Sequence, residues 1–213
     1  MKNLQKLIVL SFTLILTLSG IGFGQEKPIR IEGKFGVPNI VGGSVEYLLP
    51  ELGNEFIDNS IAPYVDFSAF GLTLDETTDM GFTYFGFGGK YYLDQQVKSL
   101  GLPGTMQGVF GGLGFGRMSL ELTDNEWFSF EHGDGTATGS IGTNMFQIKL
   151  GKRWIWGPLT VCVETGYALG SMDDKVKVDI EYDDGTTETD TEDISDVPLG
   201  VGTIGALSIG IAL

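Results

Sequence analysis

The stretch NMFQIKLGKRWIWGPLTVCVETGYALG, from Asn144 to Gly170, alternates between apolar and polar residues on both sides of a Trp-Gly-Pro sequence. Alternation with a period of two is typical of a β-strand, because successive side chains point to opposite faces. The Gly-Pro break between the two alternating halves predicts a hairpin. One face of this hairpin is apolar, and the other carries Lys149, Arg153 and Glu164. Which of these faces lies inside decides the class of protein.

The same alternation recurs along the chain from residue 29 onward, where helical periodicity is nearly absent. Long polar connections, at 123–142 and 172–199, fall at one end of the expected strands, and shorter connections fall mostly at the other. An even number of antiparallel strands with such loops is typical of outer-membrane barrels. The sequence therefore predicts an all-β fold, an eight-stranded antiparallel transmembrane β-barrel with up-and-down meander topology. Its strands are expected at 29–37, 40–49, 60–74, 80–93, 106–122, 143–154, 159–171 and 200–213.

The beginning of the chain has the composition of a secretory signal peptide. Lys2 and Lys6 provide positive charge, and the apolar stretch Leu7–Leu18 is too short to span a bilayer as a helix. Small residues for cleavage follow at Gly22-Phe23-Gly24. We therefore expect residues 1–24 to be a cleaved signal peptide and residues 25–213 to form one barrel domain in the cell outer membrane.

The composition argues against a nucleic-acid partner and against a fold held together by disulfides. The formal net charge of −15 argues against binding to nucleic acid, whose phosphates are also negative. Cys162 is the single cysteine of the chain, so a disulfide framework is excluded. Glycine is common, with 33 residues, and many of these glycines fall on the polar face of the expected strands.

That polar face indicates which side of the sheet lies inside. In the run 80–93 it consists of Gly86, Gly88 and Lys90, between large aromatic residues. Glycine makes a poor water-facing surface, but it leaves room for charged neighbours inside a narrow tube. We therefore predict that the apolar face meets lipid and the charged face lines the lumen. The expected lumen charges are Arg30, Glu32, Lys34, Glu46, Asp66, Lys90, Lys149, Arg153 and Glu164.

Confined charges must pair or stay hydrated, and eight strands enclose little more than side chains. With Trp156-Gly157 as a two-residue turn, Lys149 is expected directly opposite Glu164. We predict a lumen plugged by a charge network. A simpler interpretation is that these charges do no more than stabilise the barrel. Two alternatives stay open, a small channel with separated charges and a soluble periplasmic barrel around an apolar ligand cavity.

Two runs change phase along their length. In 60–74 the apolar set moves from Val65 and Phe67 to Phe70, and in 106–122 it moves from Phe115 to Met118. Either a β-bulge or a misplaced strand end explains such a change.

Aromatic residues gather near the connections 50–59, 94–105 and 155–158, which are the expected periplasmic turns. Tyrosine and tryptophan favour the membrane interface because each has an apolar ring and a polar tip. The sequence therefore predicts a periplasmic aromatic girdle made of Tyr47, Tyr64, Tyr91, Trp154 and Trp156, with Tyr92 beside it.

The segments GGSVEYLL, TYFGFGGKYYL, GVFGGLGFGR and GALSIGIAL resemble the small outer-membrane β-barrel proteins of OmpA/OmpX type. The resemblance covers most of residues 25–213. It implies contact with outer-membrane lipid and lipopolysaccharide, insertion by the barrel assembly machinery, and a monomer. In that family the last strand usually ends in an aromatic residue, whereas this chain ends in Leu213.

Two polar segments are candidates for chemistry. The only histidine, His132, lies in the 123–142 loop near Ser129, Glu131 and Asp134, without a recognisable nucleophile motif. The segment 172–199 holds eleven acidic residues, and Asp184-Gly185 predicts a hairpin turn in it. Its carboxylates suit Ca²⁺ or Mg²⁺, but the spacing fits no EF-hand, and a solvated acidic loop explains them better because charge runs usually stay in water. We assign no catalytic residue, cofactor or metal site, and expect a structural or surface-interaction role through these two loops.

Overall fold

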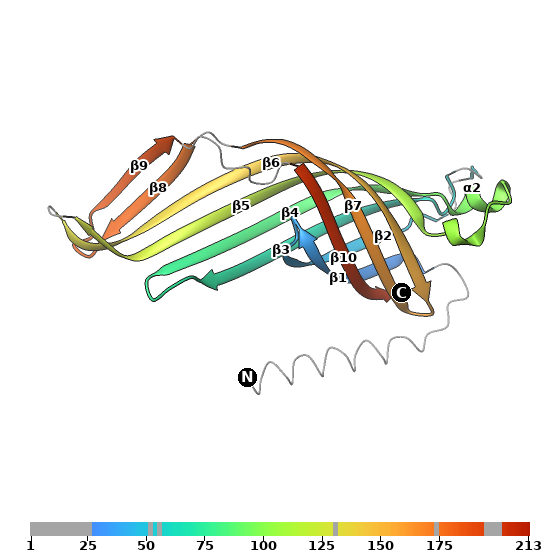
Figure 1. Ribbon diagram of the computed structural model, residues 1–213, viewed down its shortest axis with the longest axis horizontal. Coiled ribbons are helices and arrows are strands. Elements are labelled where there is room, and N and C mark those ends of the chain that lie inside the picture. Colours follow the sequence, from blue (N-terminus) through green and yellow to red (C-terminus); the bar gives the residue numbers. More distant parts are fainter. Residues whose placement is uncertain (1–26, 51–52, 55–56, 130–131, 173–174, 194–201) are drawn as a thin grey trace, which may run out of the picture.

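The fold is all-β. The computed structural model describes residues 27–50, 53–54, 57–129, 132–172, 175–193 and 202–213, so the expected signal peptide at 1–24 lies outside it. Within these residues ten strands form one antiparallel sheet, accompanied by a short helix α2 (Asp94–Ser99) and a 3₁₀ turn η1 (Gly104–Met106) (Figure 1). No helix in the described part of the chain is long and apolar enough to cross a membrane. The strands are β1 (Ile29–Val37), β2 (Val41–Tyr47), β3 (Ile61–Thr73), β4 (Thr78–Tyr92), β5 (Val109–Ser129), β6 (Gly133–Trp156), β7 (Leu159–Met172), β8 (Lys175–Tyr182), β9 (Thr187–Asp193) and β10 (Gly202–Ala212).

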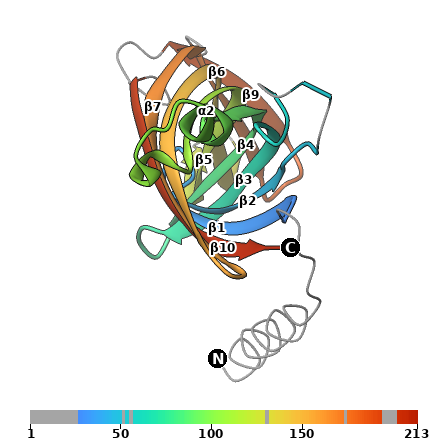
Figure 2. The same ribbon diagram turned by 90° about the vertical axis from the view of Figure 1, so that its right-hand side faces the viewer.

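Neighbouring strands in the sequence are mostly neighbours in the sheet. The order is β5-β4-β3-β2-β1-β10-β7-β6-β8-β9, and β5 also pairs with β6. Each of β1 to β7 and β10 therefore has a hydrogen-bonded neighbour on both edges, and these strands curve around a common axis (Figure 2). The described strands number ten because the expected hairpin around Asp184-Gly185 is itself the strand pair β8 and β9.

The two ends of the sheet differ. One end, here called the α2 end, carries α2 and the β6–β7 turn, and the opposite end, the hairpin end, carries β8 and β9 (Figure 1). The prediction of a loop at 123–142 is wrong, because β5 continues to Ser129 and β6 begins at Gly133. Strand β8 pairs with β6 from Gly135 to Ser140, so this part of β6 has backbone partners on both edges. Those pairings explain why a polar, glycine-containing segment is strand.

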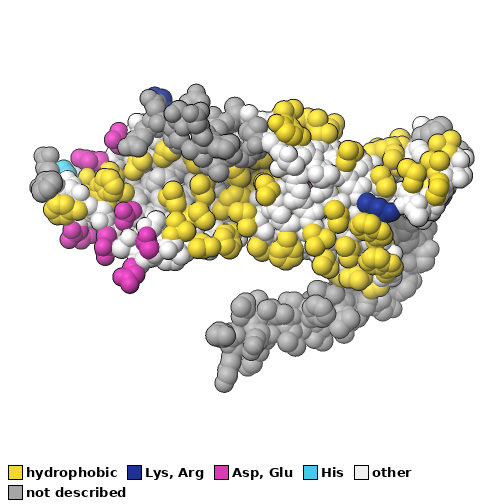
Figure 3. All heavy atoms as spheres, viewed as in Figure 1, with side chains coloured by type: hydrophobic (Ala, Val, Ile, Leu, Met, Phe, Trp, Pro, Cys, Tyr) yellow, Lys and Arg dark blue, Asp and Glu magenta, His cyan; other side chains and the backbone are white. Residues whose placement is uncertain are grey.

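Exposure alternates along the strands as the sequence pattern predicts. The outer face of the sheet exposes large apolar side chains, and they cover much of the surface between the two ends (Figure 3). The inner face buries polar and charged side chains instead. Exposed members of the apolar belt include Ile31, Phe35, Val45, Phe67, Phe85, Phe87, Leu113, Phe115, Ile148, Leu150, Val163, Leu207 and Ile209.

The phase changes in the third and fifth expected strands are not bulges. The register between β3 and β4 runs without interruption, and so does the register between β4 and β5. Phe70 and Met118 point inward and pack in an interior cluster with Phe82 and Tyr84. The phase changes because the interior turns from charged to apolar toward the hairpin end. A register shift does occur in β5, farther along, between Asp124 and Trp127.

The β6–β7 turn is displaced by one residue from the expected position. Trp156 pairs with Leu159, so the two turn residues are Gly157 and Pro158. Gly157 has a φ of 59°, which glycine adopts without steric cost. Lys149 consequently lies opposite Gly166, not opposite Glu164 as expected.

Close strand contact at Gly166 gives a testable prediction. A Cβ atom built on Gly166 would lie 2.0 Å from the backbone oxygen of Ile148. We expect Gly166→Ala to lower the free energy of unfolding by about 1–3 kcal/mol, because neighbouring backbone must shift. The matched control is Gly33→Ala on the outer face, where the nearest atom is 3.7 Å away. Urea unfolding in lipid vesicles, followed by tryptophan fluorescence, would show a change of less than about 0.5 kcal/mol for the control. Equal effects of the two changes would contradict this account.

Candidate functional site: the buried charge network

All nine predicted lumen charges lie on the inner face of the sheet and are buried. They come from six strands, because each strand contributes the residues of one parity. The relative exposure of the most exposed, Glu164, is 6%. Five cations face four carboxylates, a nearly balanced set. By strand they are Arg30, Glu32 and Lys34 of β1, Glu46 of β2, Asp66 of β3, Lys90 of β4, Lys149 and Arg153 of β6, and Glu164 of β7.

Glu46 is the centre of the group of charges nearer the α2 end. Its Oε1 atom accepts hydrogen bonds from Arg30 Nη1 at 2.5 Å, from the Tyr92 hydroxyl at 2.7 Å, and from Arg153 Nη1. Its Oε2 atom lies 3.0 Å from Lys90 Nζ. One carboxylate thus binds three cations from three different strands, β1, β4 and β6.

Arg153 continues this group toward the opposite wall. Its Nη2 atom donates to Glu32 Oε2 at 3.0 Å, and Thr160 donates to the other Glu32 oxygen at 3.0 Å. The guanidinium carbon of Arg153 also lies 5.6 Å from the ring centroid of Tyr92. Charge-assisted hydrogen bonds of this kind are stronger than neutral ones, so Arg153 links β6 firmly to β1 and β2.

A second group of charges surrounds Asp66 and Glu164. Lys34 Nζ lies 2.8 Å from Asp66 Oδ2 and 2.5 Å from Glu164 Oε1. Lys149 Nζ approaches the same two oxygens, at 3.0 Å and 3.5 Å. The expected pairing of Lys149 with Glu164 therefore exists as a contact, although the register that suggested it was wrong. Lys90 joins the two groups, because its Nζ atom also lies 3.5 Å from Glu164 Oε2.

Inward glycines make room for aromatic rings beside these charges. A Cβ atom on Gly114 would lie 2.2 Å from the Tyr64 hydroxyl oxygen, so the ring lies across a glycine. Lys149 Nζ and Lys90 Nζ lie 4.5 Å and 5.1 Å from the Tyr64 ring centroid. An aromatic face attracts a cation, and the attraction is larger when both are shielded from water. The inward glycines of β4 and β5 therefore serve the interior packing.

Apolar layers lie on both sides of the network. Toward the α2 end the layer includes Tyr92, Phe110 and Cys162, and toward the hairpin end it includes Phe82 and Met145. Both layers are built from inward residues of several strands. Together with the charges they fill the interior with side chains over most of the length of β4. The full membership is Leu48, Ala62, Tyr92, Phe110 and Cys162 for the first layer, and Phe82, Tyr84, Met118, Met145, Ala168 and Ile204, with Phe70, for the second.

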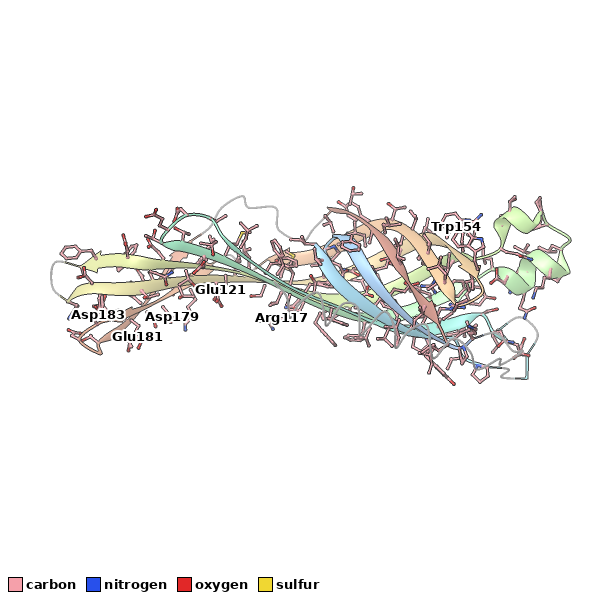
Figure 4. All side chains as sticks on the ribbon, turned by 90° about the horizontal axis from the view of Figure 1, so that it is seen from below. Arg117, Glu121, Trp154, Asp179, Glu181 and Asp183 are labelled. Carbon is pink, nitrogen blue, oxygen red and sulfur yellow. The ribbon has the colours of Figure 1, made fainter. Side chains whose placement is uncertain are left out.

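The structure places four of the five predicted girdle residues on the outer face near the α2 end. They are Tyr47, Tyr91, Trp154 and Trp156, and Figure 4 shows Trp154 at that end. Tyr64 is a wrong assignment, because it is 3% exposed and shares the inward parity of Asp66. Tyr92 is buried for the same reason. Nearness to a turn predicts the level of a residue in the sheet, but parity decides its face.

The described neighbours of His132 at the hairpin end differ from those expected. Its Nδ1 atom lies 3.5 Å from Asp184 Oδ2 and its Nε2 atom 3.6 Å from Glu188 Oε1. Its ring centroid is 4.9 Å from that of Tyr182. The pKa of Asp184 lies below its usual value because Thr186 donates hydrogen bonds to its carboxylate. Since these partners belong to the β8–β9 hairpin, some fifty residues away, local sequence gave no signal for them.

Acidic residues of the hairpin bind neighbouring side chains. Asp179 accepts hydrogen bonds from Lys177 Nζ at 2.8 Å and from the Thr189 hydroxyl at 2.8 Å. Among the described residues, no group of three or more histidine, cysteine or carboxylate side chains could hold a metal ion. Part of the acidic segment, residues 173–174 and 194–199, lies outside the described residues.

Comparison with known proteins finds similarity only at the level of solved structures. No family model matches the sequence, and no curated protein matches it. CarO2 and CarO of Acinetobacter baumannii are 12% and 11% identical, each with a TM-score of 0.42. The matches cover 89% and 87% of this chain and 100% and 98% of those chains. A major outer membrane protein of Thermus thermophilus is 14% identical, with a TM-score of 0.48, over 86% of this chain and 95% of that one.

The pairing around Glu46 leads to a stability prediction. Glu46→Gln keeps the shape of the side chain but leaves Arg30, Lys90 and Arg153 without their shared carboxylate. We expect the free energy of unfolding to fall by about 3–5 kcal/mol, as for other buried ion pairs that lose one partner. The control is Lys177→Ala, which removes the exposed ion pair with Asp179 and should cost less than about 1 kcal/mol. Urea unfolding in vesicles measures both. A similar small loss for the two variants would mean that the network contributes little.

Proposed function

We propose that this chain is an eight-stranded outer-membrane β-barrel with a filled interior and a structural or surface-interaction role. The observation that supports this most is the inversion of the two faces. Lys34, Asp66 and Lys149 are almost completely buried, while Phe35, Phe67 and Phe85 are each more than half exposed. A water-soluble protein places such groups the other way round. An outward apolar belt is stable where its surroundings are hydrocarbon.

Backbone pairing supports the same proposal. Inside a bilayer no water is available for exposed N–H and C=O groups, so a spanning sheet must pair its strands on both edges. Strands β1 to β7 and β10 are paired in this way, and they carry the apolar belt. Among the described strands, β9 is the one that has a partner strand on one edge alone, and it lies beyond the belt at the hairpin end. We therefore propose that β8 and β9 lie outside the membrane.

The packed interior argues against a diffusion channel. Charges in a conducting lumen stay hydrated and separated, whereas Glu46 and Arg153 here contact each other and lie in a set whose exposure is 0–6%. Apolar layers on both sides add two further barriers to water and ions. We propose that the network stabilises the barrel and plugs it.

The hairpin end is then the part available to other molecules. We propose that it faces the cell exterior, that lipid and lipopolysaccharide surround the belt, and that the barrel assembly machinery inserts the chain as a monomer after export. We propose no enzymatic role, since both ring nitrogens of His132 face carboxylates and a hydrolase needs its base beside a nucleophile.

A gel assay and a conductance measurement test the barrel and its plug. The protein from purified outer membranes should migrate differently on a denaturing gel before and after boiling, because a folded barrel resists detergent at room temperature. The same protein in planar bilayers should give no steady conductance above the bare membrane. Recovery in the soluble periplasm without a mobility shift would refute the membrane barrel. Steady unit conductance from a heat-modifiable protein would refute only the plug.

Orientation can be tested with inserted epitopes. An epitope between Asp184 and Gly185, at the β8–β9 turn, should bind antibody on intact cells. The control epitope between Gly157 and Pro158, at the β6–β7 turn of the α2 end, should bind only after the outer membrane is permeabilised. The reverse pattern would show that the barrel is inserted with its hairpin end toward the periplasm.

A further inference from the structure

The apolar belt contains one groove that the proposed function leaves unexplained. It lies on the outer face near the α2 end, where it crosses β3, β4, β5 and β6, and its volume is about 590 Å³. Gly89 and Gly111 form its floor, since each stands where the belt elsewhere carries a side chain. The side chains around it are apolar or aromatic and come from Ile61, Tyr91, Leu113, Ile148 and Leu150.

The two glycines leave space that nothing in the described chain fills. A Cβ atom on Gly89 would have no atom within 4 Å, and one on Gly111 would meet only the Leu150 side chain at 3.9 Å. Within hydrocarbon, an unfilled apolar groove loses dispersion contacts along its whole lining. Water does not replace them, because an apolar site gives it no hydrogen-bond partners. The groove therefore favours a flexible apolar chain as its occupant.

The end of the groove nearest α2 offers a site for a charged headgroup. Lys152 follows Leu150 by one outward position toward the α2 end. Its Nζ atom donates to the carbonyl oxygen of Thr105 and lies 5.2 Å from the Trp154 ring centroid. An ammonium group has three N–H donors, so others remain for an anion. Tyr91 lies at the same end, and its hydroxyl accepts a hydrogen bond from Gln96 of α2 at 2.6 Å.

We propose that this groove binds one acyl chain of a phospholipid whose phosphate is held by Lys152. The lipid belongs to the leaflet at the α2 end, because Trp154 and Tyr91 lie at the level where headgroups meet hydrocarbon. The chain as a whole repels a phosphate, because its formal net charge is −15. The attraction of a phosphate is therefore local to the cation at this position. The proposal rests on the membrane-barrel function and adds a specific lipid site to it.

Native mass spectrometry on the full-length barrel tests the site. The protein is refolded in phosphatidylcholine vesicles containing a minority of phosphatidylglycerol, extracted in mild detergent, and weighed with its retained lipids. We expect wild type to retain one phosphatidylglycerol. Gly89→Leu and Gly111→Leu, on two different strands, should each lower the retained fraction about tenfold, equivalent to about 1.4 kcal/mol. The matched control Gly33→Leu, an outward glycine on β1, should retain the lipid as wild type does.

The headgroup contact is tested separately with Lys152→Gln. This variant should retain one lipid but lose the preference for phosphatidylglycerol over phosphatidylcholine. Equal retention by wild type and both groove variants would overturn the site. If wild type is a dimer and the groove variants are monomers, a second copy of the chain occupies the groove, and the lipid site is overturned. Each protein is first checked for heat-modifiability. A shifted wild-type band without retained lipid refutes this site alone, whereas an unshifted band refutes the barrel itself.

Discussion

Ion pairing of each interior charge with an opposite charge is the condition that lets this sheet keep its apolar face outward. Removing an ionised group from water costs several kcal/mol unless close partners and hydrogen bonds replace the solvent. Glu46 and Asp66 provide that replacement, since each contacts cations from opposite walls of the interior. A slip of one residue in any strand would turn its charges into the belt and its apolar residues inward. The network thus stabilises one register of the strands at the expense of all others.

The sequence was sufficient to place the interior charges on strands and on one face, although it missed the extension of β5 and β6 through 123–142. Alternation alone separated every one of the nine interior charges from the apolar belt, because a strand has only two sides. It could not identify which charges meet, since the partners are distant in the chain. Lys149 and Asp66 are 83 residues apart, and Arg153 and Glu46 are 107 apart. Those contacts depend on how far each strand is displaced along its neighbours, which a local pattern does not determine.

The wrong predictions have different causes, and one of them is that period-two reasoning treats each face as uniform along the strand. For the phase changes at Phe70 and Met118 a β-bulge and a misplaced strand end were both left open, whereas the two residues lie inside an apolar layer on uninterrupted strands. Tyr64 was placed in the outer girdle for its level, although its parity directs it to the lysines of the interior. A change in polarity along the axis of the sheet is a tertiary property. A strand whose inner face is polar at one end and apolar at the other shows the same sequence signature as a bulged strand.

At the hairpin end, the ends of β5 and β6 pair with each other and with the β8–β9 hairpin, and together they form an arm. The position of this arm gives the acidity of its residues a physical explanation. Arg117 and Asn144, a register pair, are the first polar outward residues beyond Phe115 and Phe146. From there β5 continues twelve residues to Ser129, or roughly 40 Å at about 3.3 Å per residue. Figure 4 shows Asp179, Glu181 and Asp183 far along this arm and Arg117 near its base. Repulsion between carboxylates and anionic lipid headgroups is screened within about 8 Å at physiological salt. In the proposed membrane position, this arm would hold the carboxylates beyond the range of that repulsion, with Arg117 at the level of the headgroups.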